Sequence, residues 1–271
     1  MKNFKLFVLT FLCVITLVTN TYKIRTQGNL AKLVPSSYDA YAEVVSVLGI
    51  GSYEVPDCGH PVPHITVVDD SQLNSKVLGF TLHSAIDNDR CLYYDRQRAE
   101  IKVFGNSPDW MKGYAGTSFS YSWKFKLDSA FKANRTFCHL FQIKDADTAR
   151  GTPFVTLTAR TTTFQILVTT LPTPVVASAS LDLFKGNWVK VVENVTYGEN
   201  AYLSFVITNS ATGAVIMQYQ ANLKSFTSLT SGSYLRPKWG IYRSLQDKSS
   251  LKDETVLFAD FCIAEGHGTC N

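Results

Sequence analysis

Three stretches of the sequence combine cationic, amide and phenolic side chains with the alternation expected of β-strands. They are Arg98-Ala-Glu-Ile-Lys102, Gln142-Ile-Lys144 and Lys238-Trp-Gly-Ile-Tyr242. Because alternate residues of a strand share a face, each stretch gathers its polar side chains on one side. Arginine binds carboxylates through paired hydrogen bonds, and a tyrosine can transfer protons if neighbouring cations lower its pKa from about 10. These stretches therefore predict a surface that binds an extended anionic ligand.

In the segment Cys138–Asp145, the histidine is expected on the side of the strand opposite to the polar side chains. Strict alternation places Gln142 and Lys144 on the polar face and His139 on the apolar face. We therefore interpret His139 as a packed histidine rather than a reacting group.

A fourth segment continues the polar face. Thr158 and Arg160 share one side of the stretch Pro153–Arg160. His83 is a further lone candidate, because Thr81 and His83 could share the same face. An alternative explanation needs no ligand, since an antiparallel sheet ordinarily has one solvated face.

The elements that would position these residues are strands. Segments rich in Val, Ile, Thr, Phe and Tyr, separated by turn signals, predict strands at 79–83, 97–104, 117–127, 136–144, 154–160, 164–169, 188–195, 201–208, 214–221, 237–243 and 255–264. A short helix is expected around 38–48. Many strands without intervening helices predict an all-β fold: a β-sandwich jelly roll of the concanavalin A-like class, two antiparallel sheets with a concave groove.

The start of the chain resembles a secretory signal. A short basic start precedes an apolar run from Leu6 to Val18, which is too short to span a bilayer comfortably. We predict a signal peptide at 1–20, an N-terminal extension at 21–60 and a jelly-roll domain at 61–271. The protein would then be secreted and extracellular, without membrane association after signal removal; an uncleaved anchor is the alternative.

Cysteines and sequons agree with an oxidising compartment. Apart from Cys13 in the signal segment, five cysteines remain, and we predict the pairs Cys58–Cys91 and Cys262–Cys270, with Cys138 inside a strand. The cysteine spacings match no zinc motif, so we assign no metal ligand. The sequons at Asn134 and Asn194 predict glycans on surface loops.

Composition limits the partners. The formal net charge is +4, and no basic run or basic helix appears, so nucleic-acid binding is not expected. We expect a monomer that uses no cofactor; whether it binds a structural calcium ion is left open.

The three stretches resemble the strand motifs of jelly-roll polysaccharide lyases. The alginate lyases of this fold carry Arg-x-Glu-x-Arg, Gln-Ile-His and Lys-x-Gly-x-Tyr strands. The spacing from His139 to Lys144, followed by Pro153–Arg160, is closer to the secreted glucuronan lyases, polysaccharide lyase family 20. The resemblance covers Arg96 to the C-terminus. Lys144 stands where the alginate lyases have a histidine, so the role of that histidine does not transfer.

The resemblance implies β-elimination on a uronic-acid-containing polysaccharide, glucuronan- or alginate-like. Such an enzyme removes the C5 proton and expels the 4-linked oxygen after the carboxylate has been neutralised. Tyr242 would act as base and acid, with its pKa lowered by nearby cations such as Lys238, while Gln142 and Arg98 would stabilise the carboxylate. The residues that would bind the acidic polysaccharide are Lys144, Arg160, Lys238, Glu100 and Thr158.

Other functional classes fit less well. Glu100 has no second carboxylate on its polar face, which disfavours glycoside hydrolysis. No Gly-x-Ser-x-Gly elbow is present, which disfavours a serine hydrolase. The alternative that remains is a non-catalytic, lectin-like carbohydrate-binding protein, because jelly rolls host both kinds of function.

Overall fold

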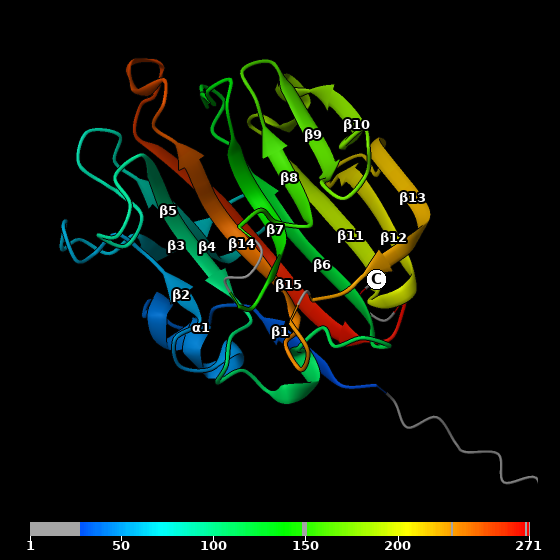
Figure 1. Ribbon diagram of the computed structural model, residues 1–271. Helices are drawn as coiled ribbons and strands as arrows, with labels where there is room; N and C mark the ends of the chain where they lie inside the picture. The colour runs from blue at the N-terminus through cyan, green and yellow to red at the C-terminus, as the bar shows by residue number, and fades with distance from the viewer. Residues whose placement is uncertain (1–27, 148–150, 229, 269, 271) are drawn as a thin grey trace, which may run out of the picture.

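The computed structural model describes residues 28–147, 151–228, 230–268 and 270, and in these ranges two antiparallel β-sheets stack face to face (Figure 1). The predicted signal peptide at 1–20 lies outside the described residues. No helix in the described part of the chain is long and apolar enough to cross a membrane. The β-sandwich prediction is confirmed.

Within the described ranges, eight strands form the larger sheet. Its order is β3-β4-β15-β6-β11-β12-β13, and β1 also pairs with β15. The bounds of its strands are β1 Leu30–Leu33, β3 Ile65–Asp70, β4 Ser75–Leu82, β6 Ser118–Lys126, β11 Trp188–Thr196, β12 Gly198–Asn209, β13 Val215–Phe226 and β15 Glu254–Glu265.

The smaller sheet has seven strands in the described part of the chain, in the order β10-β9-β8-β7-β14-β5-β2. The bounds are β2 Tyr53–Glu54, β5 Arg96–Lys102, β7 Cys138–Asp145, β8 Val155–Ala159, β9 Thr163–Val168, β10 Val175–Ser180 and β14 Leu235–Ser244. The two C-terminal strands take central places, β14 between β5 and β7, and β15 between β4 and β6.

Four short helices complete the described elements. They are α1 Ala40–Leu48 and the 3-10 turns η1 Asp109–Met111, η2 Leu181–Phe184 and η3 Lys248–Ser250. The helix α1 confirms the helix expected around 38–48; Asp39 caps its N-terminus by accepting a hydrogen bond from the backbone of Ala42. The segment 21–60 also supplies β1 to the larger sheet and β2 to the smaller one.

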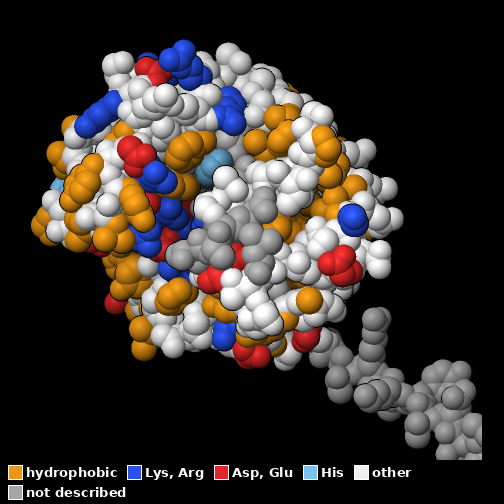
Figure 2. Space-filling model, viewed as in Figure 1, with side chains coloured by type: hydrophobic (Ala, Val, Ile, Leu, Met, Phe, Trp, Pro, Cys, Tyr) orange, Lys and Arg blue, Asp and Glu red, His pale blue; other side chains and the backbone are white. Residues whose placement is uncertain are grey.

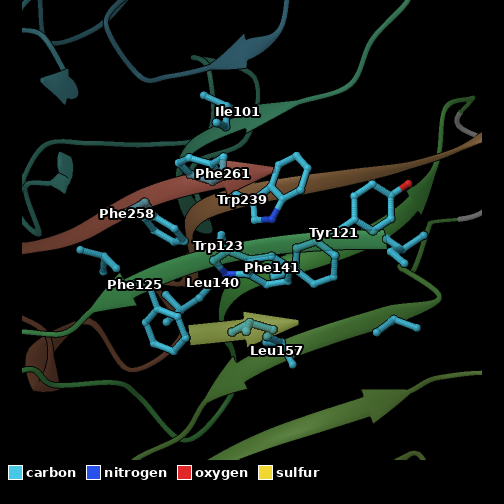
Figure 3. Packing of buried hydrophobic residues seen from close by; sticks show 14 of the residues in the cluster. Ile101, Tyr121, Trp123, Phe125, Leu140, Phe141, Leu157, Trp239, Phe258 and Phe261 are labelled. Atoms are coloured by element: carbon cyan, nitrogen blue, oxygen red, sulfur yellow. The ribbon is translucent and has the colours of Figure 1, made fainter. Parts of the chain in front are cut away.

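An aromatic core between the sheets fixes which faces remain polar. Trp123 of β6 packs against Phe141 of β7 and Trp239 of β14, with ring centroids 4.6 and 6.0 Å away (Figure 3). All three rings are buried. Since Trp239 points inward, the alternate residues Lys238 and Tyr242 lie on the opposite face of the smaller sheet.

The predicted disulfides are confirmed, and one sequon is corrected. Cys58 pairs with Cys91 and Cys262 with Cys270, while Cys138 is a buried free thiol. The expectation that Asn134 lies on a surface loop is wrong. The Asn134 side chain is 1% exposed, and its Nδ2 atom, where a glycan would attach, donates a hydrogen bond to the Ser244 carbonyl at 2.6 Å.

Gly240 in β14 is required by the backbone. Its φ is +142°, and a Cβ atom there would lie 2.2 Å from the carbonyl oxygen of Ala99 on β5. The close pairing of β14 with β5 thus depends on a residue without a side chain.

We predict that Gly240→Ala lowers the free energy of unfolding by at least about 2 kcal/mol, because strain at positive φ adds to the clash. Urea denaturation measures the change. Gly105→Ala is the matched control, since a Cβ atom there meets nothing within 4 Å. Equal stability of the two variants would contradict the prediction.

Candidate functional site

The register of the smaller sheet brings the predicted site residues onto adjacent strands. Tyr242 pairs with Arg98 on one side and with His139 on the other, and Lys238 pairs with Gln142. Thr158 of β8 lies opposite His139. Figure 2 shows basic and acidic side chains gathered in one band over β5 and β14.

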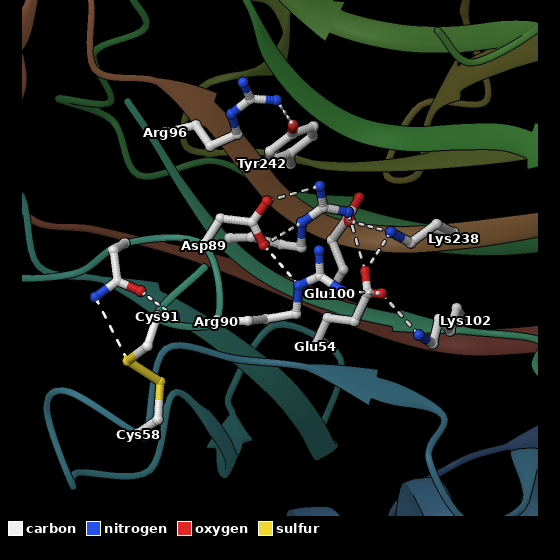
Figure 4. Close-up of polar contacts among 12 residues, drawn as sticks. Glu54, Cys58, Asp89, Arg90, Cys91, Arg96, Glu100, Lys102, Lys238 and Tyr242 are labelled. Carbon is white, nitrogen blue, oxygen red and sulfur yellow. Dashed lines mark hydrogen bonds and ion pairs between the residues drawn. A yellow bond between two sulfur atoms is a disulfide. The ribbon is translucent and has the colours of Figure 1, made fainter. Parts of the chain in front are cut away.

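Buried carboxylates organise the centre of this band. Glu54 of β2 accepts hydrogen bonds from Arg98 at 3.0 Å, from Lys102 at 2.7 Å and from Arg90 at 3.1 Å, and it also pairs with Lys238 (Figure 4). Burial alone would raise the pKa of Glu54, but these four cations hold it well below its ordinary value.

Glu100 is the second buried carboxylate. It pairs with Arg98 at 2.9 Å and with Lys238 at 2.8 Å, and it accepts a hydrogen bond from Gln142 Nε2 at 2.6 Å. Burial raises its pKa, but the nearby cations more than offset this and lower it. The side chain is fully buried, so its contacts position neighbouring cations rather than present it to a ligand.

These contacts change the interpretation of Lys238 and Gln142. Lys238 was expected to tune Tyr242, but its ammonium group is committed to Glu54 and Glu100. The amide nitrogen of Gln142 faces Glu100, and its predicted role at a substrate carboxylate stays a prediction.

Tyr242 is held by two arginines. The guanidinium carbon of Arg98 lies 3.8 Å from the ring centroid, and Arg96 Nη1 donates a hydrogen bond to the phenol oxygen at 3.1 Å. Burial raises the pKa of Tyr242, and both arginines only partly oppose it. The expectation that cations lower this pKa below its ordinary value is therefore wrong, and Tyr242 is a protonated phenol, suited to donate a proton.

His139 lies on the polar face, not on the apolar face that alternation predicted. The register of β7 shifts between His139 and Phe141, so Leu140 and Phe141 both enter the core. The His139 ring lies 5.8 Å from the Tyr242 ring, and its Nδ1 atom is 2.8 Å from Thr158 Oγ1. Burial lowers the pKa of His139 to about 3, so the imidazole is neutral, and it is a weak base unless a nearby anion raises its pKa.

Two more cations, Lys144 and Arg160, belong to the predicted site. Lys144 Nζ donates to the Gly151 carbonyl at 2.6 Å, and burial lowers the pKa of Lys144 to about 8. Arg160 is half-buried and donates to the Arg135 carbonyl at 3.2 Å.

Sequence reasoning missed Arg236, which pairs with Lys144 across β14 and β7. It is 7% exposed, yet its Nε and Nη1 atoms have no hydrogen-bond partner within the described residues. Arg236 lies two residues before Lys238 and therefore on the same face of the strand, a pattern from which it could have been predicted. Glu54 and Asp89, by contrast, have no such periodic signal.

The predicted candidate His83 does not belong to this face. It follows β4 of the larger sheet, and its Nδ1 atom lies 3.1 Å from Asp87. Because β4 belongs to the larger sheet, His83 cannot lie on the polar face that carries Tyr242.

A cavity lies beside Phe137, a neighbour of Tyr242. A cavity of about 540 Å³ is lined in part by Asp95, Phe137 and Gln246. Phe137 contacts the Tyr242 ring with centroids 5.1 Å apart. Tyr242 and His139 are not among the residues that line this cavity.

No protein-family model matches the sequence, and no curated protein matches it. Solved structures do match the fold. The endo-β-1,4-glucuronan lyase of the fungus Trichoderma reesei aligns with TM-score 0.56 and 14% identity over 89% of this chain and 96% of that chain. The family 14 alginate lyase of Aplysia kurodai gives TM-score 0.56 and 14% identity over 89% and 100%.

A family 7 alginate lyase aligns with TM-score 0.54 and 13% identity over 82% of this chain and 98% of that chain. This chain shares the fold of jelly-roll polysaccharide lyases. The resemblance seen in the three strand motifs is thereby confirmed at the level of fold, at identities where function does not follow from similarity.

We predict that Glu54→Gln lowers the free energy of unfolding at pH 7 by about 3 to 5 kcal/mol, because it leaves buried cations uncompensated. The folded-state pKa of Glu54 lies below its ordinary 4.5. The carboxylate therefore stabilises the folded protein fully above pH 4.5, and this stabilisation is lost as pH falls through the folded-state pKa.

Urea unfolding at neutral and at acidic pH measures both effects. Glu199→Gln is the control, since Glu199 is exposed and bonds Ser225; we expect a change within about 0.5 kcal/mol. A Glu54→Gln penalty that stays constant down to acidic pH would argue against the charge as its cause.

Proposed function

We propose that the protein is a polysaccharide lyase that cleaves a glucuronan- or alginate-like polyuronate by β-elimination. The observation that carries the proposal is the pairing of a neutral imidazole, His139, with a protonated phenol, Tyr242, on a cationic sheet face. The fold shared with polysaccharide lyases supports it by analogy.

His139 starts without the proton that it must take, and Tyr242 starts with the proton that it must donate. A substrate carboxylate beside His139 would raise the low pKa of the imidazole, as a nearby anion does. His139 takes the C5 proton, the C5–H electron pair forms the C4–C5 double bond, and the C4–O bond breaks. Tyr242 donates its proton to the departing oxygen. The products are a saccharide with a new chain end and an unsaturated uronate, so no water or cofactor is consumed.

Cations at the Tyr242 end would stabilise the negative charge that develops on the carboxylate. Arg96 contacts Tyr242 directly, and Arg160 lowers the pKa of His139 through its charge, although less than burial does. Lys144 and Arg236 lie near the other end of the face. Since Arg236 and Tyr242 are six residues apart on β14, about 20 Å at 3.3 Å per residue, they would bind other sugars of an extended polymer.

The proposal includes secretion. Two disulfides, Cys58–Cys91 and Cys262–Cys270, are stable in an oxidising compartment.

We predict that Tyr242→Phe and His139→Asn each reduce turnover on glucuronan or alginate by about 10²-fold to 10⁴-fold, as expected for loss of a general acid or base. Ultraviolet absorbance of the conjugated double bond in the product measures the reaction. Tyr38→Phe and His267→Ala are controls, because both side chains are exposed and belong to neither strand of the site.

The same experiment separates a lyase from a lectin. Polymer binding by the wild-type protein without unsaturated product, across glucuronan, alginate and related polyuronates, would favour the carbohydrate-binding alternative. Production of unsaturated sugars by both variants at the wild-type rate would place the proton-transfer groups elsewhere.

We predict that the KM for a polyuronate rises as pH increases through about 8, because Lys144, with a pKa of about 8, then loses its positive charge. Lys144→Arg should remove this part of the pH dependence, since guanidinium stays charged. Initial rates across pH 7 to about 9.5 in constant salt test the point. Identical KM profiles for both proteins would show that Lys144 does not contact the polymer.

A further inference from the structure

Three histidines and an aspartate converge away from the Tyr242 site. His60 and His64 lie between β2 and β3, His83 directly follows β4, and Asp87 lies in the loop before β5. One ligand atom from each residue lies within 4.8 Å of the corresponding atoms of the others. These residues, named here the histidine cluster, come from two separate segments, 60–64 and 83–87, so neither segment alone holds the full set.

The nitrogen atoms of the histidine cluster converge on Asp87. His60 Nδ1 and His64 Nε2 each lie 3.0 Å from Asp87 Oδ1, and His83 Nδ1 lies 3.1 Å from Oδ2. The ring centroids are 4.6 to 5.4 Å apart, each pair edge to face. The ligands of a tetrahedral zinc ion lie about 3.3 Å apart, given metal–nitrogen bonds of about 2.0 Å, so small side-chain shifts would complete the geometry.

His64 is a fully buried member of the histidine cluster. Its Nε2 atom is directed at Asp87 Oδ1, 3.0 Å away, without forming a regular hydrogen bond to it or to another described residue. A metal ion between these two atoms would take both as ligands.

An outer layer of hydrogen bonds already orients the ligands. The other ring nitrogen of His64, Nδ1, bonds Asp57, which also accepts a hydrogen bond from the Tyr41 hydroxyl at 2.6 Å. Asp87 Oδ2 accepts a hydrogen bond from the backbone N–H of His83. Carboxylates that hold the second nitrogen of a metal-bound histidine are a regular feature of zinc sites.

Covalent and backbone contacts hold the segments together. The Cys58–Cys91 disulfide joins the segment that carries His60 and His64 to the loop that carries Asp87. Gln97 Nε2 of β5 donates to the carbonyls of His83 at 2.8 Å and Asp87 at 3.0 Å. The cluster is therefore built into the fold and not a chance meeting of mobile surface side chains.

We propose that His60, His64, His83 and Asp87 form a zinc site with three imidazole ligands and one carboxylate. Imidazole suits zinc, whereas calcium takes oxygen ligands, so calcium does not fit. Four protein ligands make a closed coordination sphere, which indicates a structural ion rather than a catalytic one. The inference does not depend on lyase activity.

The site has a consequence for the sheet face. Two residues after Asp87, Asp89 pairs with Arg98 at 3.0 Å, and Arg98 stacks on Tyr242. An ion that fixes the loop at Asp87 therefore also fixes the anchor of Arg98.

Metal content of the purified protein tests the proposal. After removal of metals with a chelator, we expect the protein to take up one Zn²⁺ per chain in competition with a chromophoric chelator. Co²⁺ should give the visible absorption of a tetrahedral site. At about 100-fold excess over its Kd, Zn²⁺ should raise the thermal midpoint by about 5 to 10 °C, while Ca²⁺ should not.

Variants locate the ion. His60→Ala and His83→Ala change partly exposed side chains and should each abolish stoichiometric binding and the Co²⁺ spectrum. His267→Ala, an exposed histidine on the larger sheet's side, is the matched control and should bind like the wild type. Absence of stoichiometric zinc uptake by the wild-type protein, or full uptake by both cluster variants, would overturn the proposal.

Discussion

The smaller sheet depends on two carboxylates buried among cations. Glu54 and Glu100 bring Arg98, Lys102 and Lys238 onto one face, although moving each charge out of water costs several kcal/mol. A pair of opposite charges at 4 Å gains about 4 kcal/mol at an effective dielectric constant of 20. Because each carboxylate serves more than one cation, a concentration of positive charge becomes compatible with a packed sheet.

This network divides the polar face into an interior and a periphery. In the interior, charges satisfy each other and support the strands β2, β5, β14 and β7. At the periphery, Tyr242 with His139 occupies one end, and Lys144 with Arg236 occupies the other. The rigid interior therefore sets the separation between the Tyr242–His139 pair and the two cations, a spacing that the proposed polyuronate substrate would span.

The alternation of polar and apolar residues predicted much of this arrangement. It succeeded for β5 and β14 because these two strands pair without a register shift, so alternate residues stay on one face. It failed at His139, where a bulge in β7 depends on the registers of both neighbouring strands and is invisible in one segment. Glu54 and the histidine cluster come from irregular segments whose proximity is created by tertiary folding. The disulfides were predictable because cysteine number and strand context left few sensible pairs. The strands β1, β2, β3 and β10 are short or exposed, and the alternation of apolar and polar residues in them is too weak to predict a strand.

The central places of β14 and β15 affect how the protein must be made. During synthesis, the strands β5 and β7 emerge from the ribosome long before β14, which separates them, and the same holds for β4 and β6 relative to β15. The nascent chain therefore exposes unpaired strand edges in both sheets until its last strands arrive, a state prone to aggregation. Because many contacts join distant residues and the last strands arrive late, protection of the nascent chain by chaperones would affect the yield of folded protein.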